Sequence, residues 1–218
     1  MSVPNPGVLG LAPSFGYGDR LGSATPGHLE AHRDLGSGIA PIFAQQSIRE
    51  MERTDRSPTD VMTAVAGALT AAGFTGAWGA DADHLKTTVD VDATAAAGYT
   101  FFTIDPSDHV DIAADDYSAA QVDQHFAAVR SEIDWVDTYL GQTVAFDGFE
   151  IDFDEATVRR AAVKYGRAIA HSRRLAAHIQ RAAASAGTEP EIELSVDETP
   201  QPTTLAEHYV IADQCRRD

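Results

Sequence analysis

The chain has 218 residues, 44% of them hydrophobic, which is enough for one substantial buried core or two small ones. Acidic residues outnumber Lys and Arg by 33 to 16, for a formal net charge of −17. This charge repels nucleic acid and anionic membranes, so we expect neither as a partner. Such a surplus of acid is also typical of adaptation to high salt. The single cysteine, Cys215, excludes an intramolecular disulfide framework and a cysteine-based zinc site.

Neither a membrane anchor nor an export signal is visible in the sequence. No apolar run approaches the roughly 18 residues that a spanning helix needs. The first ten residues, MSVPNPGVLG, lack the basic segment and apolar stretch of a secretory signal. We therefore expect a cytoplasmic protein.

Five short apolar runs are predicted to be strands. Single helices of about 10 to 15 residues separate the first four, and this alternation is typical of βαβ units with a parallel sheet. Two architectures then remain, a doubly wound sheet or a (β/α)8 barrel. No GxGxxG motif follows any strand, so a dinucleotide-binding sheet has no support. The expected strands are 8–12, 39–44, 75–80, 100–105 and 191–197.

Capping residues mark the three helices between these strands. Thr25 is expected to cap the first helix. Ser57 and Asp60 have the spacing of a capping box at the start of the second. The third helix is expected to open at Thr87 or Thr88.

The interval between the fourth and fifth strands is much longer than the others. Two helical patterns are expected there, near 117–140 and 154–186, of which one is the crossover helix. The other belongs to a helical insertion at about 111–150. The second pattern has a basic face, which indicates a solvated surface, a subunit contact or an anionic ligand, with the solvated surface favoured. Its cations are Arg159, Arg160, Lys164, Arg167, Arg173, Arg174 and Arg181.

The number of strands limits the architecture. A (β/α)8 barrel needs eight strands and about 250 residues, so five strands and a final helix do not close one. The sequence is compatible with a complete five-stranded sheet or with the front part of a longer barrel.

Polar residues follow each expected strand, where the loops of a parallel α/β fold form its active site. The third strand leads into GADADHLK, 79–86, which holds two carboxylates, an imidazole and an ammonium group. The helix after this segment has its own cap, so Asp81, Asp83 and His84 are not needed to start it. His84 beside two acids could supply a nitrogen ligand with nearby bases. We therefore expect an active site at this segment.

The fifth expected strand, EIELSVDE, alternates strictly between polar and apolar residues. A strand buried in a parallel sheet is normally apolar on both faces. In a barrel, the acidic face would line the lumen, where carboxylates need a metal, a partner or a perturbed pKa. The alternative is an edge strand with a solvated face. The residues expected on the polar face are Glu191, Glu193, Ser195 and Asp197.

Five motifs, in this order, resemble the tagaturonate epimerase family of hexuronate catabolism. They are FGYGDRLGSATPGH, FAQQSIREMERT, GADADHLK, FFTIDPSDHV and ELSVDET. The resemblance runs from about Ser14 to His208. It implies an incomplete (β/α)8 TIM-like barrel, a divalent metal cation, and interconversion of D-tagaturonate and D-fructuronate as small-molecule substrates.

The resemblance also implies roles for single residues. It implies that Asp83 is the proton acceptor, Glu193 the proton donor and His84 a metal ligand. Members of the family are about twice as long and supply further metal ligands from later strands, so we expect this chain to be an N-terminal fragment. Candidates for substrate binding, chosen for charge or hydrogen-bonding capacity at strand ends, are Arg20, Gln46 and Lys86.

The implied reaction constrains its mechanism. The two hexuronates differ at a carbon β to the ketone, so the ketone does not acidify its C–H bond. Retro-aldol cleavage, rotation of the aldehyde fragment and re-addition are one route, with an acid and a base exchanging the hydroxyl proton. Two alternatives remain open: a class II-type sugar-acid aldolase that releases the fragments, or a truncated remnant without catalytic activity.

Overall fold

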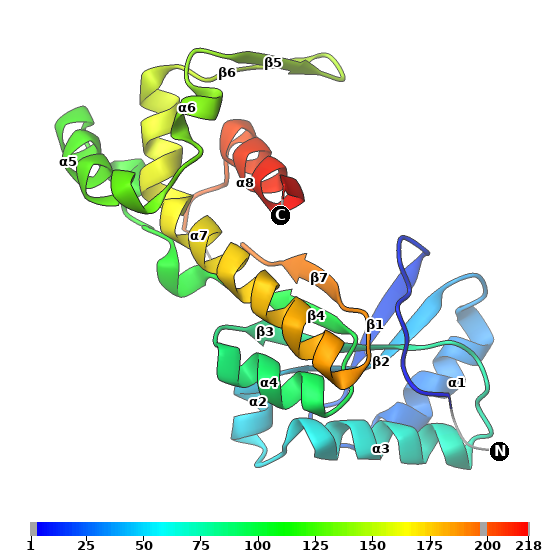
Figure 1. The fold of residues 1–218 in the computed structure, drawn as a ribbon. Helices are drawn as coiled ribbons and strands as arrows, with labels where there is room; N and C mark the ends of the chain where they lie inside the picture. Colours follow the sequence, from blue (N-terminus) through cyan, green and yellow to red (C-terminus); the bar gives the residue numbers. More distant parts are fainter. Residues whose placement is uncertain (1–3, 197–199, 218) are drawn as a thin grey trace. The chain divides into compact units, whose positions relative to one another are not determined.

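The computed structural model describes residues 4–196 and 200–217 (Figure 1). The described chain forms two compact units. The sheet unit contains residues 4–105 and 175–195, and the helical unit contains the rest. Each unit has its own packed interior, so each is described by itself.

The sheet unit is built on five parallel strands in the order β1-β2-β3-β4-β7. This confirms the predicted α/β class with five parallel strands. The strand order follows the chain and contains no reversal, whereas a doubly wound sheet changes direction at a switch point. The strands are β1 (Ser14–Gly18), β2 (Ala40–Ser47), β3 (Gly79–Leu85), β4 (Phe101–Ile104) and β7 (Glu191–Leu194).

Helices cover one face of this sheet and form the hydrophobic core with it (Figure 1). The helices are α1 (Thr25–Leu35), α2 (Ile48–Arg53), α3 (Pro58–Ala71), α4 (Thr88–Ala96) and the last part of α7 (Glu155–Ala186). Strand side chains such as Phe43, Ala82 and Phe102 meet helix side chains such as Leu69 and Ile179 in this core. Each of these five is fully buried, so the helix-facing side of the sheet is apolar.

The first strand lies later in the chain than predicted. The apolar run 8–12 is not a strand, and β1 is Ser14–Gly18 instead. Gly10 has a φ of +62°, outside the extended region that a strand requires. The backbone N–H groups of Leu9 and Gly10 donate to the carboxylate of Glu191 over 2.8 and 2.6 Å, so the run crosses to β7 as a loop.

The third strand is also displaced, and this correction matters most for function. The segment 79–85, expected to begin the loop after a strand at 75–80, is itself β3. Ala80 and Ala82 point into the core and are fully buried, while Asp81 and Asp83 alternate to the other face. Small side chains fit close helix packing, so tertiary context outweighs their weak intrinsic preference for strands.

The predicted caps are confirmed in two helices and wrong in one. Thr87 caps α4 and Ser57 caps α3, each in a complete capping box. In α1 the N-cap position belongs to Ala24, and its side chain makes no capping bond. The carboxylate of Asp19 takes that role, because it accepts four backbone N–H groups between residues 22 and 25 at 2.8–3.1 Å.

The helical unit contains less continuous helix than predicted. The pattern at 117–140 is broken into α5 (Ala119–Val129), a 3-10 turn and α6 (Val136–Tyr139). An unpredicted antiparallel hairpin of β5 (Thr143–Phe146) and β6 (Phe149–Asp152) follows. Asp147 and Gly148 form its turn with positive φ angles, which suits a two-residue hairpin loop.

The last two helices agree with the sequence patterns. The predicted helix at 154–186 is α7, and the amphipathic segment after the fifth strand forms α8 (Leu205–Arg217). None of the helices in the described ranges is both long and apolar enough to cross a membrane.

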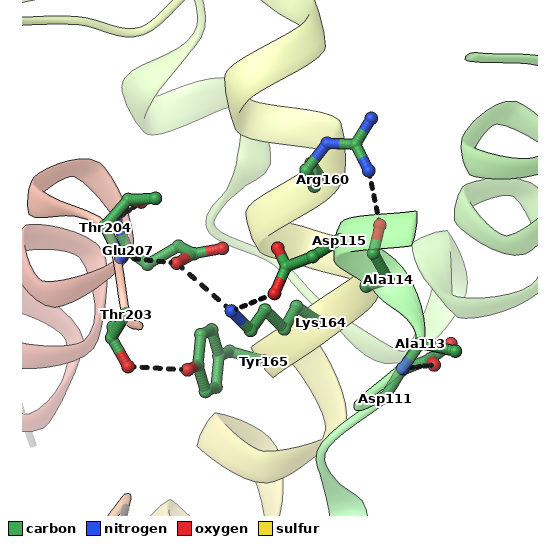
Figure 2. Close-up of polar contacts among 10 residues, drawn as sticks. All are labelled: Asp111, Ala113, Ala114, Asp115, Arg160, Lys164, Tyr165, Thr203, Thr204 and Glu207. Carbon is green, nitrogen blue, oxygen red and sulfur yellow. Dashed lines mark hydrogen bonds and ion pairs between the residues drawn. The ribbon is translucent and has the colours of Figure 1, made fainter. Parts of the chain in front are cut away.

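Part of the basic face of α7 is paired within the chain, whereas Arg174 and Arg181 on the same face are exposed, as predicted for a solvated surface. Figure 2 shows Lys164 between two carboxylates, with its Nζ 2.6 Å from Asp115 and 3.5 Å from Glu207. Arg160 donates to the carbonyl oxygens of Ala114 and Tyr117. These cations therefore hold the helical unit together and do not require an external anion.

Candidate functional site

The sheet face opposite the helices carries a polar row across four adjacent strands. Gln45 on β2 is level with Asp81 on β3, and Thr103 on β4 is level with Glu193 on β7. Side chains at equivalent positions of neighbouring parallel strands point to the same face and lie close together. The predicted polar face of the fifth strand is therefore part of a continuous row.

Hydrogen bonds join the members of this row. The Nε2 of Gln45 donates to Asp81 over 3.1 Å. The hydroxyl of Thr103 lies 3.2 Å from Oδ1 of Asp81 and 2.8 Å from Oε2 of Glu193. Asp81 is thus held from both sides by neutral groups.

The carboxyl group of Asp81 has a strongly perturbed pKa. Burial raises its pKa, the neighbouring charge of Asp83 raises it further, and the bonds from Gln45 and Thr103 lower it. The net result is a pKa of about 7. Perturbed acids of this kind are concentrated at functional sites.

A bulge at the end of β3 turns two predicted site residues toward solvent. His84 has a φ of +54°, and the β3–β4 register shifts between Ala82 and Leu85. Because of this extra residue, Leu85 returns to the core and is fully buried, although its parity matches Asp83. A strained non-glycine conformation at a strand end is a common feature of functional sites.

His84 lies between two carboxylates. Its Nε2 is 3.7 Å from Asp83, and its Nδ1 is 3.5 Å from Asp105. Asp105 also lies 3.6 Å from the Nζ of Lys86. Asp105 therefore connects two residues that the sequence had placed in the site, and it orients the imidazole ring.

An open pocket of about 650 Å³ lies at the carboxyl ends of β1, β2 and β3. Asp83 and His84 line it, together with two of the predicted substrate-binding residues, Arg20 and Gln46. The side chain of Arg20 is 70% exposed and lies 3.5 Å from Glu50, so its guanidinium group is accessible to a ligand. The structure thus gathers four of the six predicted site residues at one pocket.

Gln46 adds an unsatisfied donor to this pocket. The residue is 4% exposed, and its Nε2 has no hydrogen-bond partner within the described part of the chain. A buried donor without a partner costs about 1–3 kcal/mol, so a ligand oxygen that accepts this bond would gain affinity.

The predicted metal centre is not assembled by the residues that the structure describes. Within residues 4–196 and 200–217, no group of three His, Cys, Asp or Glu side chains is arranged to hold a metal ion. His84 and its two carboxylate neighbours lie at hydrogen-bonding or ion-pair distances, not in a ligand cage.

Three residues of the site were not singled out from the sequence. Gln45 belongs to the polar segment after the second predicted strand, Thr103 to the apolar run of the fourth, and Asp105 is one of several acids at the end of the fourth. Strand parity could have identified the first two, because Gln45, Asp81 and Thr103 share a face once the register is known. Asp197, expected on the same face as Glu193, lies outside the described residues.

The fold and the site together define an α/β protein with carboxylic acids and a histidine at the carboxyl ends of parallel strands. The tagaturonate epimerase family model matches residues 1–218. The chain belongs to this family, and the resemblance seen in its motifs is confirmed.

Two known proteins illustrate the relationship. The tagaturonate/fructuronate epimerase of Thermotoga maritima is 40% identical over 209 residues, which cover 95% of this chain and 42% of that protein. Native and glycerol-bound crystal structures of the fructuronate-tagaturonate epimerase UxaE from Cohnella laeviribosi match with a TM-score of 0.84 and 34% identity. The matched region covers 98% of this chain and 43% of the Cohnella laeviribosi chain. The chain thus spans less than half the length of these relatives.

Proposed function

We propose that this chain contributes the Asp83–His84 part of an active site that interconverts D-tagaturonate and D-fructuronate. The observation that carries the proposal is the bulge in β3, which directs Asp83 and His84 into the pocket that Arg20 and Gln46 also line. Relatives that share this segment are named for the same epimerisation. The substrate is a small hexuronate.

In this proposal, Asp83 and Glu193 act as proton acceptor and donor. They lie on β3 and β7 with β4 between them, so they approach a substrate above the sheet from two sides. Asp83 removes the proton of the hydroxyl group at the inverted carbon, the adjacent C–C bond breaks, and Glu193 donates a proton to the ketone oxygen, which gives an aldehyde and an enediol. The aldehyde rotates and the bond re-forms on its other face, while Asp83 returns its proton to the aldehyde oxygen and the enediol returns its proton to Glu193.

Substrate contacts follow from the same pocket. The exposed guanidinium group of Arg20 suits the hexuronate carboxylate, since Arg binds carboxylates with two parallel hydrogen bonds. Gln46 offers its unused Nε2 to a hydroxyl or carbonyl oxygen. Lys86, held near Asp105, is the third candidate.

We also propose that the sheet closes into a (β/α)8 barrel in the longer members of the family. The sequential strand order and the helices on a single face support this, because a barrel needs both. The polar row would then line the lumen. A crystal structure of a full-length relative with an open or doubly wound sheet would contradict this proposal.

We also propose that the epimerase depends on a divalent metal ion and is located in the cytoplasm. His84 would be one metal ligand, and further ligands would come from outside the described residues. The metal content of the purified chain, compared with that of His84→Ala, tests the first. Fractionation of the source cells tests the second.

The function is tested by incubating the purified chain with D-tagaturonate in D2O. We expect D-fructuronate without deuterium at the inverted carbon, because retro-aldol cleavage breaks a C–C bond and not the C–H bond. Asp83→Asn should lower the rate by about 10²- to 10⁴-fold, the usual share of a general base. Asp34→Asn, on the exposed side of α1, is the matched control and should leave the rate unchanged.

Other outcomes identify the alternatives. Stoichiometric deuterium at the inverted carbon would require proton exchange at that carbon. Accumulation of three-carbon products would identify a sugar-acid aldolase. A folded chain that turns over neither hexuronate would contradict the proposed activity of this segment.

A further inference from the structure

Three residues of the polar row form a hydrogen-bonded line, of which the proposed acid–base roles use only Glu193. Asp81 on β3, Thr103 on β4 and Glu193 on β7 are joined through one hydroxyl group, at 3.2 Å on one side and 2.8 Å on the other. Asp81 is 3% exposed, whereas Glu193 is exposed. The line therefore leads from a buried carboxyl group to an accessible one.

The single hydroxyl proton of Thr103 determines how many of the two carboxyl groups can be ionised. A threonine hydroxyl has one proton to donate and can accept further bonds through its lone pairs. It cannot donate to two ionised carboxylates at once, so both contacts are satisfied only when one carboxyl group carries a proton. Burial disfavours the charged form, so the proton resides on Asp81 and not on the exposed Glu193.

We propose that Asp81 stores a proton and that Thr103 passes it to Glu193, so that Glu193 holds a proton when it acts as the donor. Asp81 and Thr103 are positioning residues in this scheme, because neither touches the substrate. The proposal rests on the proposed function for its biological role. Its physical content, a proton shared along three residues, can be measured without catalysis.

The transfer is balanced and needs no further reactant. The O–H bond of the Asp81 carboxyl group breaks while a new O–H bond forms at the hydroxyl oxygen of Thr103. The original hydroxyl proton of Thr103 moves at the same time to Oε2 of Glu193. Asp81 ends ionised, Thr103 is unchanged, and Glu193 ends protonated.

The groups around Asp81 favour such a store near neutral pH. Gln45 faces it from β2, Asp83 from its own strand, Thr103 from β4 and Glu193 from β7, and the phenol of Tyr99 lies within range of its charge. None of these groups is a cation. Burial and the charge of Asp83 place the pKa of Asp81 at about 7, so its proton can be both held and released at neutral pH.

The first test follows the two carboxyl groups by ¹³C NMR titration of the purified chain. In the wild type, we expect the Glu193 carboxyl resonance to show a second step when Asp81 titrates near pH 7. In Thr103→Val, which keeps the side-chain shape but lacks the hydroxyl, that second step should vanish. Thr103→Ser restores the hydroxyl and should restore the step. Asp81→Asn should leave Glu193 with a single step.

The outcome that overturns the relay is equally direct. Glu193 titrating identically in the wild type, Thr103→Val and Asp81→Asn would show that no proton is shared along this line. Circular dichroism and thermal melting establish that each variant is folded, and Thr103→Ser separates loss of the hydroxyl from a general packing effect.

The second test uses the epimerase reaction. Thr103→Val should lower kcat by about 10- to 100-fold with KM unchanged, and Thr103→Ser should recover most of the rate. The pH profile should lose its limb near pH 7 in Asp81→Asn. An unaltered kcat and profile in both variants would contradict the relay. If the chain epimerises no hexuronate, the proposed function fails, and the titration alone decides the relay.

Discussion

Lys164 in the helical unit and Asp81 in the sheet unit are both almost completely buried, at 1% and 3% exposure. Their surroundings differ in kind. The ammonium group of Lys164 has two carboxylates within 3.5 Å, whereas Asp81 receives hydrogen bonds only from an amide and a hydroxyl within the described chain. One buried charge has opposite charges beside it, and the other has none.

This difference separates structural from chemical use of a buried ionisable group. Burial alone lowers the pKa of Lys164, but the hydrogen bond that it donates to Asp115 and the charge of Glu207 reverse the effect and raise the pKa. The lysine therefore stays charged at neutral pH. Asp81, without a cation, changes its charge near neutral pH. A paired group can fix helices in place, and an unpaired one can exchange protons.

The largest effect is expected from removing the cation of the helical unit. Lys164→Met leaves Asp115 and Glu207 facing each other without compensation. Breaking a buried pair in this way costs about 3–5 kcal/mol. Trp135 is buried in the helical unit, so its fluorescence during urea unfolding in a Trp78→Phe background measures the loss there.

Arg167→Met is the matched control on the same helix. Arg167 forms a pair with Glu132, with N–O distances of 2.7–3.1 Å, but its side chain is 50% exposed. An exposed pair contributes about 0–1 kcal/mol because water screens it. Equal losses in the two variants would show that burial of Lys164 does not set the strength of its interactions.

A second effect, of pH on stability, tests the other side of the comparison. The pKa of Asp81 is about 7 in the folded chain and 3.8 as its ordinary value. Below pH 3.8 both the folded and the unfolded chain hold the Asp81 proton. Between pH 3.8 and about 7, only the folded chain holds it. The free energy of unfolding therefore falls as the pH rises from about 4 to about 7, by up to about 4 kcal/mol.

Asp81→Asn should flatten this dependence, because an amide does not ionise. The measurement is urea unfolding from pH 4 to pH 8, followed by Trp78 in the sheet unit in a Trp135→Phe background. A wild-type curve that is already flat over this range would mean that Asp81 is ionised throughout, and it would remove the stored proton from the relay as well.

Much of the fold could be predicted from local signals. The capping box at Ser57 and a threonine at 87 or 88 identified the starts of two helices, because a cap is a contact between residues three apart. The strand boundaries were less accurate where they were predicted from apolar content alone. The run 8–12 is apolar but crosses to Glu191 as a loop, and 79–85 is polar and small but forms the central strand.

The site could be located from the sequence, but its connections could not. The polar segment around Asp83 and His84 was identifiable as a strand end, and family motifs gave its residues expected roles. The contact of Thr103 with Asp81 and Glu193 depends on the register of three strands. The pairing of Lys164 depends on a turn and a helix far along the chain, so its face read as solvated.

The smallest effect concerns Asp19, another buried acid, at 6% exposure. Burial raises its pKa, but the N–H groups of Thr25, Ala24 and Ser23 outweigh this and leave it lowered. Its stabilisation is therefore complete above pH 3.8 and is lost as the pH falls through its folded value, opposite in sign to Asp81. Asp19→Asn should cost about 1–2 kcal/mol at pH 7 and much less near pH 2, measured by urea unfolding through Trp78. A loss of the same size at both pH values would mean that the geometry of the side chain, and not its charge, holds the start of α1. Asp19 and Asp81 would then differ in the hydrogen-bond donors around them and not in how their charge affects stability.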